Sequence, residues 1–171
     1  MSGRDVCREL HSGLRDRKWA GRHEELLIWL DGLTGVQQCI RNGLQQSFDA
    51  EDWGMFERYV LAAYRKPSQS YTATLCAALR RRVKNLNNED VAEALGAIAD
   101  PAAVGCLEEA LDWAPPWDEF RQLGVKCIWA LSSINNKEAR DALGRAVKSN
   151  ESPEIREAAA KELELLRAGS G

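Results

Sequence analysis

The chain repeats itself, and this internal repeat constrains its fold more than any other feature. Residues 98–103 (IADPAA) align with residues 134–139 (INNKEA) at an offset of 36, and residues 119–121 align with residues 154–156 at an offset of 35. Apolar residues then fall on equivalent positions of the helical patterns that follow. A period of this size, with two helices per unit, is typical of an α-solenoid, in which each unit buries its apolar face against the next.

A longer repeat extends the pattern toward the N-terminus. Residues 22–26 resemble residues 87–91 at an offset of 65, and residues 53–56 resemble residues 117–120 at an offset of 64. A unit of about three helices therefore occurs twice. We expect one continuous domain over residues 1–168 rather than two unrelated domains.

The apolar patterns are helical along the whole chain, so the expected fold class is all-α. In the N-terminal part, for example, Leu26, Leu30 and Leu33 share one helical face. The expected architecture is an α-α superhelix of about five helix pairs. The last residues, 169–171 (GSG), are expected to be a tag remnant or a disordered tail.

Composition and charge narrow the class of protein. Of the 171 residues, 44% are hydrophobic and 29% are charged, which is typical of a soluble globular protein. The net charge of −3 gives no support to a nucleic-acid partner. No apolar run approaches the ~20 residues of a membrane helix, and the N-terminal residues lack the apolar segment of a secretory signal. A cytoplasmic protein that does not bind a membrane is expected.

The five cysteines form neither a CxxC nor a CxH motif, and their number is odd. Each lies within a helical apolar pattern. The favoured interpretation is five small buried thiols in a reducing cytosol, with a zinc site or a catalytic cysteine as the less favoured alternatives. The residues are Cys7, Cys39, Cys76, Cys106 and Cys127.

Two segments resemble a known family. Residues 92–104 (AEALGAIADPAAV) resemble the helix–turn–helix junction of HEAT-like repeats of the phycobilisome-lyase type, and residues 125–131 (VKCIWAL) resemble a segment of small bacterial HEAT-repeat proteins. Some of those proteins resemble immunity proteins encoded beside bacterial toxins. The resemblance implies a superhelical fold and a role in protein binding. No residue pattern marks a chromophore site, so a lyase activity is not expected.

Two loops carry the residue types that anchor protein interfaces. Residues 112–119 (DWAPPWDE) combine two tryptophans with two prolines that stiffen the loop. The acidic residues 48–53 (FDAEDW) are expected on the same edge of the stack, where both loops would engage a basic partner. The alternative is that the rings fill gaps between helices. The predicted partner-binding residues are Trp113, Trp117, Asp118, Glu119, Asp49, Glu51, Asp52 and Trp53.

A cluster of cations lies in the last turns of a helix expected over residues 70–86. The favoured interpretation is that these charges complement the negative end of the helix. The alternative is a basic patch that binds phosphate or an acidic partner. The residues are Arg80, Arg81, Arg82 and Lys84.

No catalytic arrangement is evident, so neither an enzyme nor a bound cofactor or metal is expected. The chain has two histidines, no glycine-rich phosphate loop and no GxSxG motif. The leading hypothesis is an immunity protein that binds and neutralises a cognate bacterial toxin. The alternative is a scaffold or regulatory subunit. A DNA-binding protein similar to the HEAT-like alkylpurine DNA glycosylases is less favoured, because that function needs a basic groove.

Overall fold

The computed structural model describes residues 3–19 and 22–169, and every regular element within these ranges is a helix. The all-α prediction is therefore confirmed for the described part of the chain. The ten α-helices are α1 (Gly3–Arg15), α2 (His23–Gly32), α3 (Gln37–Asp49), α4 (Trp53–Arg65), α5 (Thr72–Arg81), α6 (Asn88–Ile98), α7 (Val104–Leu111), α8 (Gln122–Ile134), α9 (Lys137–Ser149) and α10 (Pro153–Ala168). Three short 3-10 helices complete the set: η1 (Arg17–Trp19), η2 (Gln69–Tyr71) and η3 (Pro101–Ala103).

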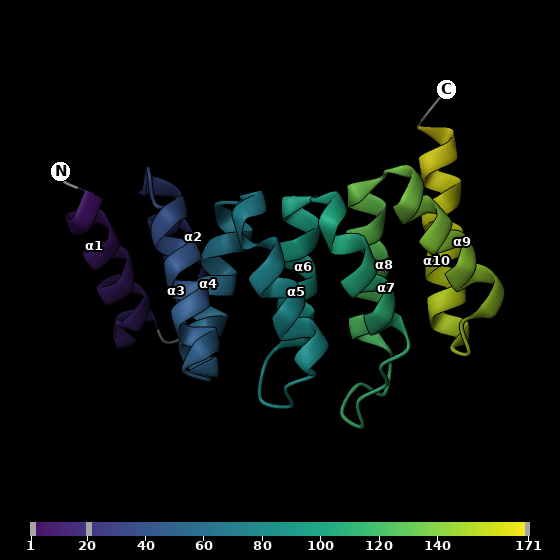
Figure 1. Cartoon of the computed structure of the whole chain (residues 1–171), viewed down its shortest axis with the longest axis horizontal. Helices are drawn as coiled ribbons and strands as arrows, with labels where there is room; N and C mark the ends of the chain where they lie inside the picture. The colour runs from purple at the N-terminus through teal and green to yellow at the C-terminus, as the bar shows by residue number, and fades with distance from the viewer. Residues whose placement is uncertain (1–2, 20–21, 170–171) are drawn as a thin grey trace.

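The helices stand in two layers along the long axis of the molecule (Figure 1). In one layer the even-numbered helices contact one another in order, from α2 through α4, α6 and α8 to α10. In the other layer the odd-numbered helices do the same, from α1 through α3, α5 and α7 to α9. The two termini lie at opposite ends of the array (Figure 1). Contacts therefore connect segments that are near in sequence.

Side-chain caps explain where several helices begin. Asn136 accepts a hydrogen bond from the backbone N–H of Ala139 at 2.7 Å and so starts α9. Asp100 accepts a hydrogen bond from the N–H of Ala102 at 3.1 Å and opens the short helix η3, and α7 begins only at Val104. Each cap satisfies an N–H group that has no partner within the helix.

Helix α5 ends at Arg81, before the predicted end at Leu86. Arg82 adopts a left-handed conformation with φ 54°, and its N–H bonds to the carbonyl of Leu79 at 3.2 Å. This conformation terminates the helix. Arg82 and Lys84 therefore lie on the loop, whereas Leu86 is still buried. The helical spacing of Leu86 reflected its burial but not its secondary structure.

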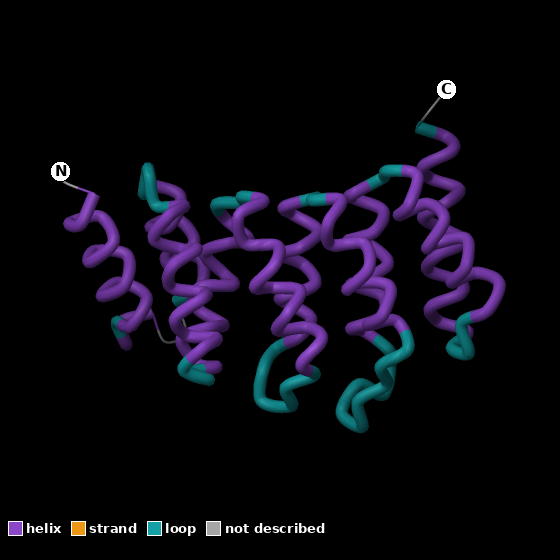
Figure 2. The backbone as a smooth tube through the Cα atoms, viewed as in Figure 1, coloured by secondary structure: helices purple, strands orange, loops and turns teal. Residues whose placement is uncertain are grey.

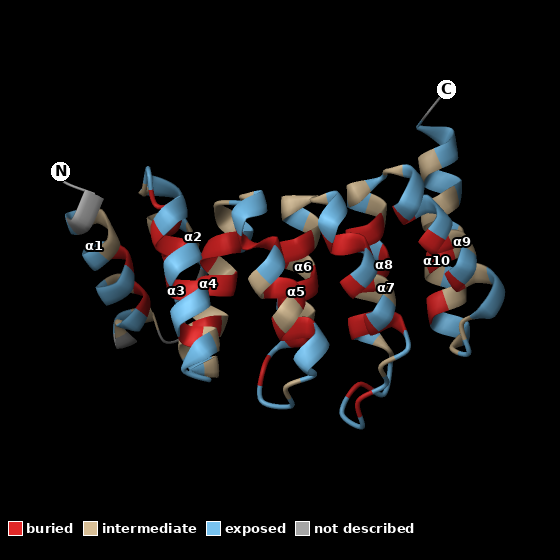
Figure 3. Cartoon of the chain, in the orientation of Figure 1, coloured by how far each residue is buried: buried red, intermediate tan, exposed pale blue. Residues whose placement is uncertain are grey.

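The core lies between the layers, and buried positions recur along the whole molecule (Figure 3). Two helices of the even-numbered layer come close together at Gly96 in α6. A Cβ atom at this position would lie 3.0 Å from the Cα atom of Ala130 in α8. Only a residue without a side chain allows these two backbones to come so close.

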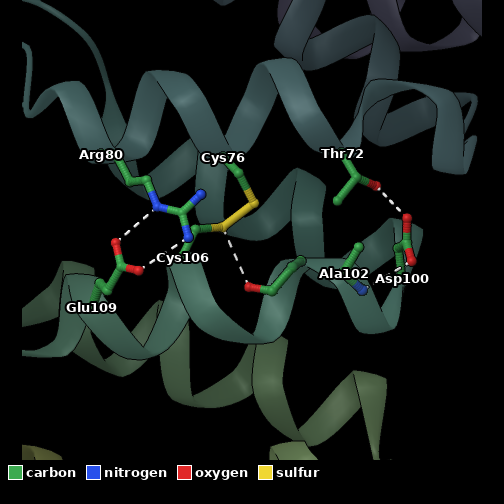
Figure 4. The surroundings of a disulfide bond; sticks show 8 residues. Thr72, Cys76, Arg80, Asp100, Ala102, Cys106 and Glu109 are labelled. Carbon is green, nitrogen blue, oxygen red and sulfur yellow. Dashed lines mark hydrogen bonds and ion pairs between the residues drawn. A yellow bond between two sulfur atoms is a disulfide. The ribbon is translucent and has the colours of Figure 1, made fainter.

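The cysteine prediction is wrong for four of the five residues. A disulfide joins Cys7 in α1 to Cys39 in α3, and a second joins Cys76 in α5 to Cys106 in α7 (Figure 4). The partners are 32 and 30 residues apart, close to one repeat, so neighbouring helices of the odd-numbered layer place them side by side. Cys127 is a buried free thiol, and its burial raises its pKa to about 12.

The helices within residues 3–19 and 22–169 include none that combines the length and the apolar character needed to cross a membrane. At the C-terminus, the N–H of Gly169 bonds to the carbonyl of Leu165 at 3.0 Å and closes α10. Gly169 is thus the C-terminal cap of α10. Ser170 and Gly171 lie outside the described residues.

Candidate functional site

Four loops lie along one edge of the array, which we call the loop edge (Figure 2). They comprise residues 50–52, 82–87, 112–121 and 150–152, and each connects an odd-numbered helix to the even-numbered helix that follows. Both of the aromatic, acidic loops singled out in the sequence lie on this edge, with the arginine-bearing loop between them. The candidate site is therefore built from three consecutive units.

Arg81 connects the end of α5 to the loop before α4. Its guanidinium forms an ion pair with Glu51. The same guanidinium lies over two rings, with its Cζ atom 5.5 Å from the centroid of Trp53 and 5.6 Å from that of Phe48. Trp53 is half-buried and packs edge-on against Phe48 and Phe56. Trp53 thus fills space between helices, and the guanidinium of Arg81 covers its ring.

Arg82 makes the equivalent contact on the other side. Its Cζ atom lies 5.8 Å from the ring centroid of Trp113. Trp113 packs against the core and meets Trp117 in an edge-to-face arrangement, with centroids 6.3 Å apart. Trp117 is 46% exposed. The two tryptophans of this loop therefore differ, since the first packs inward and the second faces solvent.

Arg80 pairs with Glu109 in α7 through two hydrogen bonds of 2.8 and 3.0 Å (Figure 4). This contact lowers the pKa of Glu109 and raises that of Arg80, because each charge stabilises the other. The three arginines of the cluster thus point to three different partners within the chain. Lys84 is exposed on the loop between α5 and α6.

Two of the predicted partner-binding carboxylates start helices instead. Asp118 is 7% exposed and accepts hydrogen bonds from the N–H groups of Gln122 at 2.6 Å and Leu123 at 3.1 Å. Asp52 accepts from the N–H of Met55 at 3.1 Å and caps α4. A carboxylate at this end of a helix also meets the positive end of the helix dipole.

The exposed part of the long loop is its tip. Trp117 and Glu119 are exposed, and Phe120 is 69% exposed. Arg121 braces this tip by donating a hydrogen bond to the carbonyl of Leu111 at 2.6 Å, across the base of the loop. Asp49 is exposed on the neighbouring loop side and accepts a hydrogen bond from Gln45.

Phe120 was missed by sequence reasoning. The repeat aligned it with Phe56 and Ile155, both of which are fully buried. The difference arises because α8 begins only at Gln122, so Phe120 lies on the loop, whereas Phe56 and Ile155 lie inside α4 and α10. The buried position in α8 is taken by Leu123 instead. The two prolines of the loop were the signal that this unit begins late.

The described residues contain no group of three or more histidine, cysteine, aspartate or glutamate side chains placed to hold a metal ion. His11 is engaged with Tyr59, with 2.8 Å between its Nδ1 atom and the phenolic oxygen. No family model matches the chain, and no curated protein matches it either. The resemblance to HEAT-like and immunity proteins therefore stays a prediction.

Proposed function

We propose that the two-layered array is an α-solenoid of HEAT-like repeats. Three observations support this: helices of one layer contact one another in sequence order, the termini lie at opposite ends, and the paired cysteines are about one repeat apart. Repeat arrays of this kind offer extended surfaces for other macromolecules. The proposed fold therefore favours a binding function over a catalytic one.

The proposed function is that of an immunity protein that binds and neutralises a bacterial toxin. The observation that carries it is the exposed tip of the loop edge, where Trp117, Glu119 and Phe120 stand on a loop held by the buried Asp118. Exposed aromatic side chains on a rigid support lose little entropy on binding and anchor interfaces. The carboxylates beside them favour a basic toxin domain, such as a nuclease.

The test compares two losses of exposed apolar surface on the purified protein. The variant Trp117→Ala/Phe120→Ala removes the aromatic tip, and the matched variant Ile28→Ala removes an exposed apolar side chain on α2 that is 70% exposed. Each tagged protein is used to capture a basic protein encoded beside its gene. The proposal expects capture by the wild type and by Ile28→Ala, and loss of capture by the tip variant.

Inhibition of the captured protein distinguishes an immunity protein from a scaffold. Co-expression with the wild type should suppress the lethality of the captured protein, and co-expression with Trp117→Ala/Phe120→Ala should not. Capture without suppression would indicate a scaffold or regulatory subunit. Retention of nucleic acid that falls steeply with added salt would instead indicate DNA binding.

The compartment needs its own test, because the two disulfides do not suit the reducing cytosol that was expected. Disulfides persist in oxidising compartments and are rare in the cytosol. We therefore propose a thiol count on protein alkylated as its cells are broken. Five reactive thiols after unfolding would support the cytoplasm, and one thiol, that of Cys127, would place the protein in an oxidising compartment.

A further inference from the structure

A hollow of about 280 Å³ lies on the even-numbered layer, away from the loop edge. It is lined from α4, α6 and α8, with Tyr64 and Trp129 among its walls and Gly96 and Ala97 at its floor. Its volume falls just below the ~300–1,000 Å³ of small-molecule sites, so it is better matched to one side chain than to a free ligand.

The aromatic walls of this hollow are exposed. Tyr64 is 43% exposed and Trp129 is 46% exposed. The other lining residues of α6 and α8 include the small residues Gly96, Ala97 and Ala130. Tyrosine and tryptophan are the residue types that carry binding energy in protein interfaces and that attract cations to their faces.

The hollow already holds one cation of the chain itself. The ammonium of Lys126 lies 5.1 Å from the ring centroid of Trp129 and forms an ion pair with Glu93. One ring and one carboxylate thus hold a positive charge at the wall of the hollow. This contact shows which chemistry the surface accepts.

A second carboxylate on α6, that of Glu89, also interacts with this lysine. Burial raises the pKa of Glu89, and the carboxylate of Asp118 raises it further. Asp90 and Glu93 act on the pKa of Glu89 in the same direction, and Lys126 acts against them. Glu89 and Glu93 on α6 thus both interact with the ammonium of Lys126, which leaves these three groups with one net negative charge and complementary to a further cation.

We propose that this hollow binds an arginine side chain carried by a basic segment of a protein partner. The guanidinium plane would stack on the exposed rings of Tyr64 and Trp129 and hydrogen-bond to the carboxylates on α6. Arginine fits better than lysine, because its planar group both stacks on rings and meets carboxylates in a forked geometry. This surface is separate from the loop edge, so the inference does not depend on the aromatic tip being a binding site.

The test is a titration of the ¹⁵N-labelled full chain with a hexa-arginine peptide. The chain has six tryptophans, and each gives an indole N–H signal that reports locally on binding. The signal of Trp129, assigned with Trp129→Leu, should shift most. The same peptide with citrulline in place of arginine keeps the shape and loses the charge, so it should cause no shift.

Matched variants separate this hollow from the acidic loop edge. Trp129→Leu and Glu93→Gln should each raise the Kd for hexa-arginine about threefold to tenfold, as loss of one cation–π or charged contact predicts. Trp117→Leu and Glu119→Gln remove the same groups at the loop edge and should leave the Kd within about twofold. Equal weakening by both pairs, or a larger shift of the Trp117 signal, would overturn the proposal.

Removing the ammonium of Lys126 should change the Kd for hexa-arginine in the opposite direction. Lys126→Gln removes the competing ammonium and should tighten the peptide about threefold. Lys137→Gln makes the same change in net charge on α9, where the side chain is 84% exposed, and should have a smaller effect. Equal tightening by both would mean that only net charge matters. The peptide titration uses no toxin, so a negative titration would not affect the proposal of toxin binding at the loop edge. In the same way, failure to capture a toxin would not affect the proposal of arginine binding in the hollow.

Discussion

Replacing Asp118 by alanine should destabilise the fold more than any other single change on the loop edge. The side chain is 7% exposed and receives two backbone N–H groups, those of Gln122 at 2.6 Å and Leu123 at 3.1 Å. Loss of a helix cap costs about 1 kcal/mol, and each hydrogen bond to a charged group contributes about 1.5–3 kcal/mol. Partial rescue by water leaves an expected loss of about 3 kcal/mol in the free energy of unfolding.

Thermal and chemical unfolding measure this loss directly. At about 2–4 °C per kcal/mol for a chain of this length, Asp118→Ala should lower the Tm by about 9 °C. Glu119 is the next residue and its side chain is exposed. Glu119→Ala should therefore change the free energy of unfolding by less than about 0.5 kcal/mol. Asp118→Asn keeps one acceptor oxygen and should fall between the two.

The result also decides what Asp118 does. If Asp118→Ala unfolds like the wild type, the carboxylate does not hold α8, and the argument from its hydrogen bonds fails. If the variant is as stable as the wild type and loses a protein partner, the original prediction of a partner-binding residue is restored. A large loss of stability with partner binding retained by the remaining folded protein would make it a structural residue.

Three further predictions concern packing, covalent links and pH. Gly96→Ala should lower the free energy of unfolding by about 1–3 kcal/mol, because its Cβ would press on Ala130. Gly144→Ala, which has open space around it, should raise the free energy of unfolding by about 0.5–1 kcal/mol. Urea unfolding measures both changes. A disulfide stabilises a fold by restricting the unfolded chain, so reducing the disulfides should lower the free energy of unfolding by about 3 kcal/mol per bond. An unchanged urea midpoint after reduction would contradict this. Burial and the carboxylate of Asp118 raise the pKa of Glu89 in the folded protein. Ionisation of Glu89 therefore disfavours folding once the pH rises above the ordinary glutamate pKa of ~4.3. Glu89→Gln should raise the free energy of unfolding at pH 7 but not at pH 3.

The sequence was sufficient to predict the helical class because its periodicity is strong. A polar cap precedes the apolar repeat of α9, where Asn136 starts the helix. The prediction was less accurate where the backbone conformation of a single residue sets a helix boundary. Arg82 and Arg121 both adopt positive φ without being glycine, and no residue pattern announces this.

The candidate site was predictable in composition but not in pairing. The arginine cluster and the two aromatic loops were identified separately, as a basic patch and as acidic loops. Their contacts, such as Arg81 with Glu51 and Arg82 over Trp113, depend on the lateral spacing of neighbouring units. The cysteine pairs depend on the same spacing, which a search for local motifs does not detect. The hollow beside Trp129 also combines three helices that are separated in sequence.

The two disulfides also determine how the molecule would respond to a pulling force applied at its ends. Each bond bypasses the chain between its cysteines, which are 32 and 30 residues apart. At about 3.5 Å per extended residue, each bond withholds about 100 Å of chain from stretching. Oxidised protein would extend only through the residues before Cys7, residues 40–75 and the part that follows Cys106. Reduction would release the two chain segments that the disulfides close, which are of nearly equal length. The end-to-end distance of the stretched protein would therefore depend on whether its disulfides are reduced.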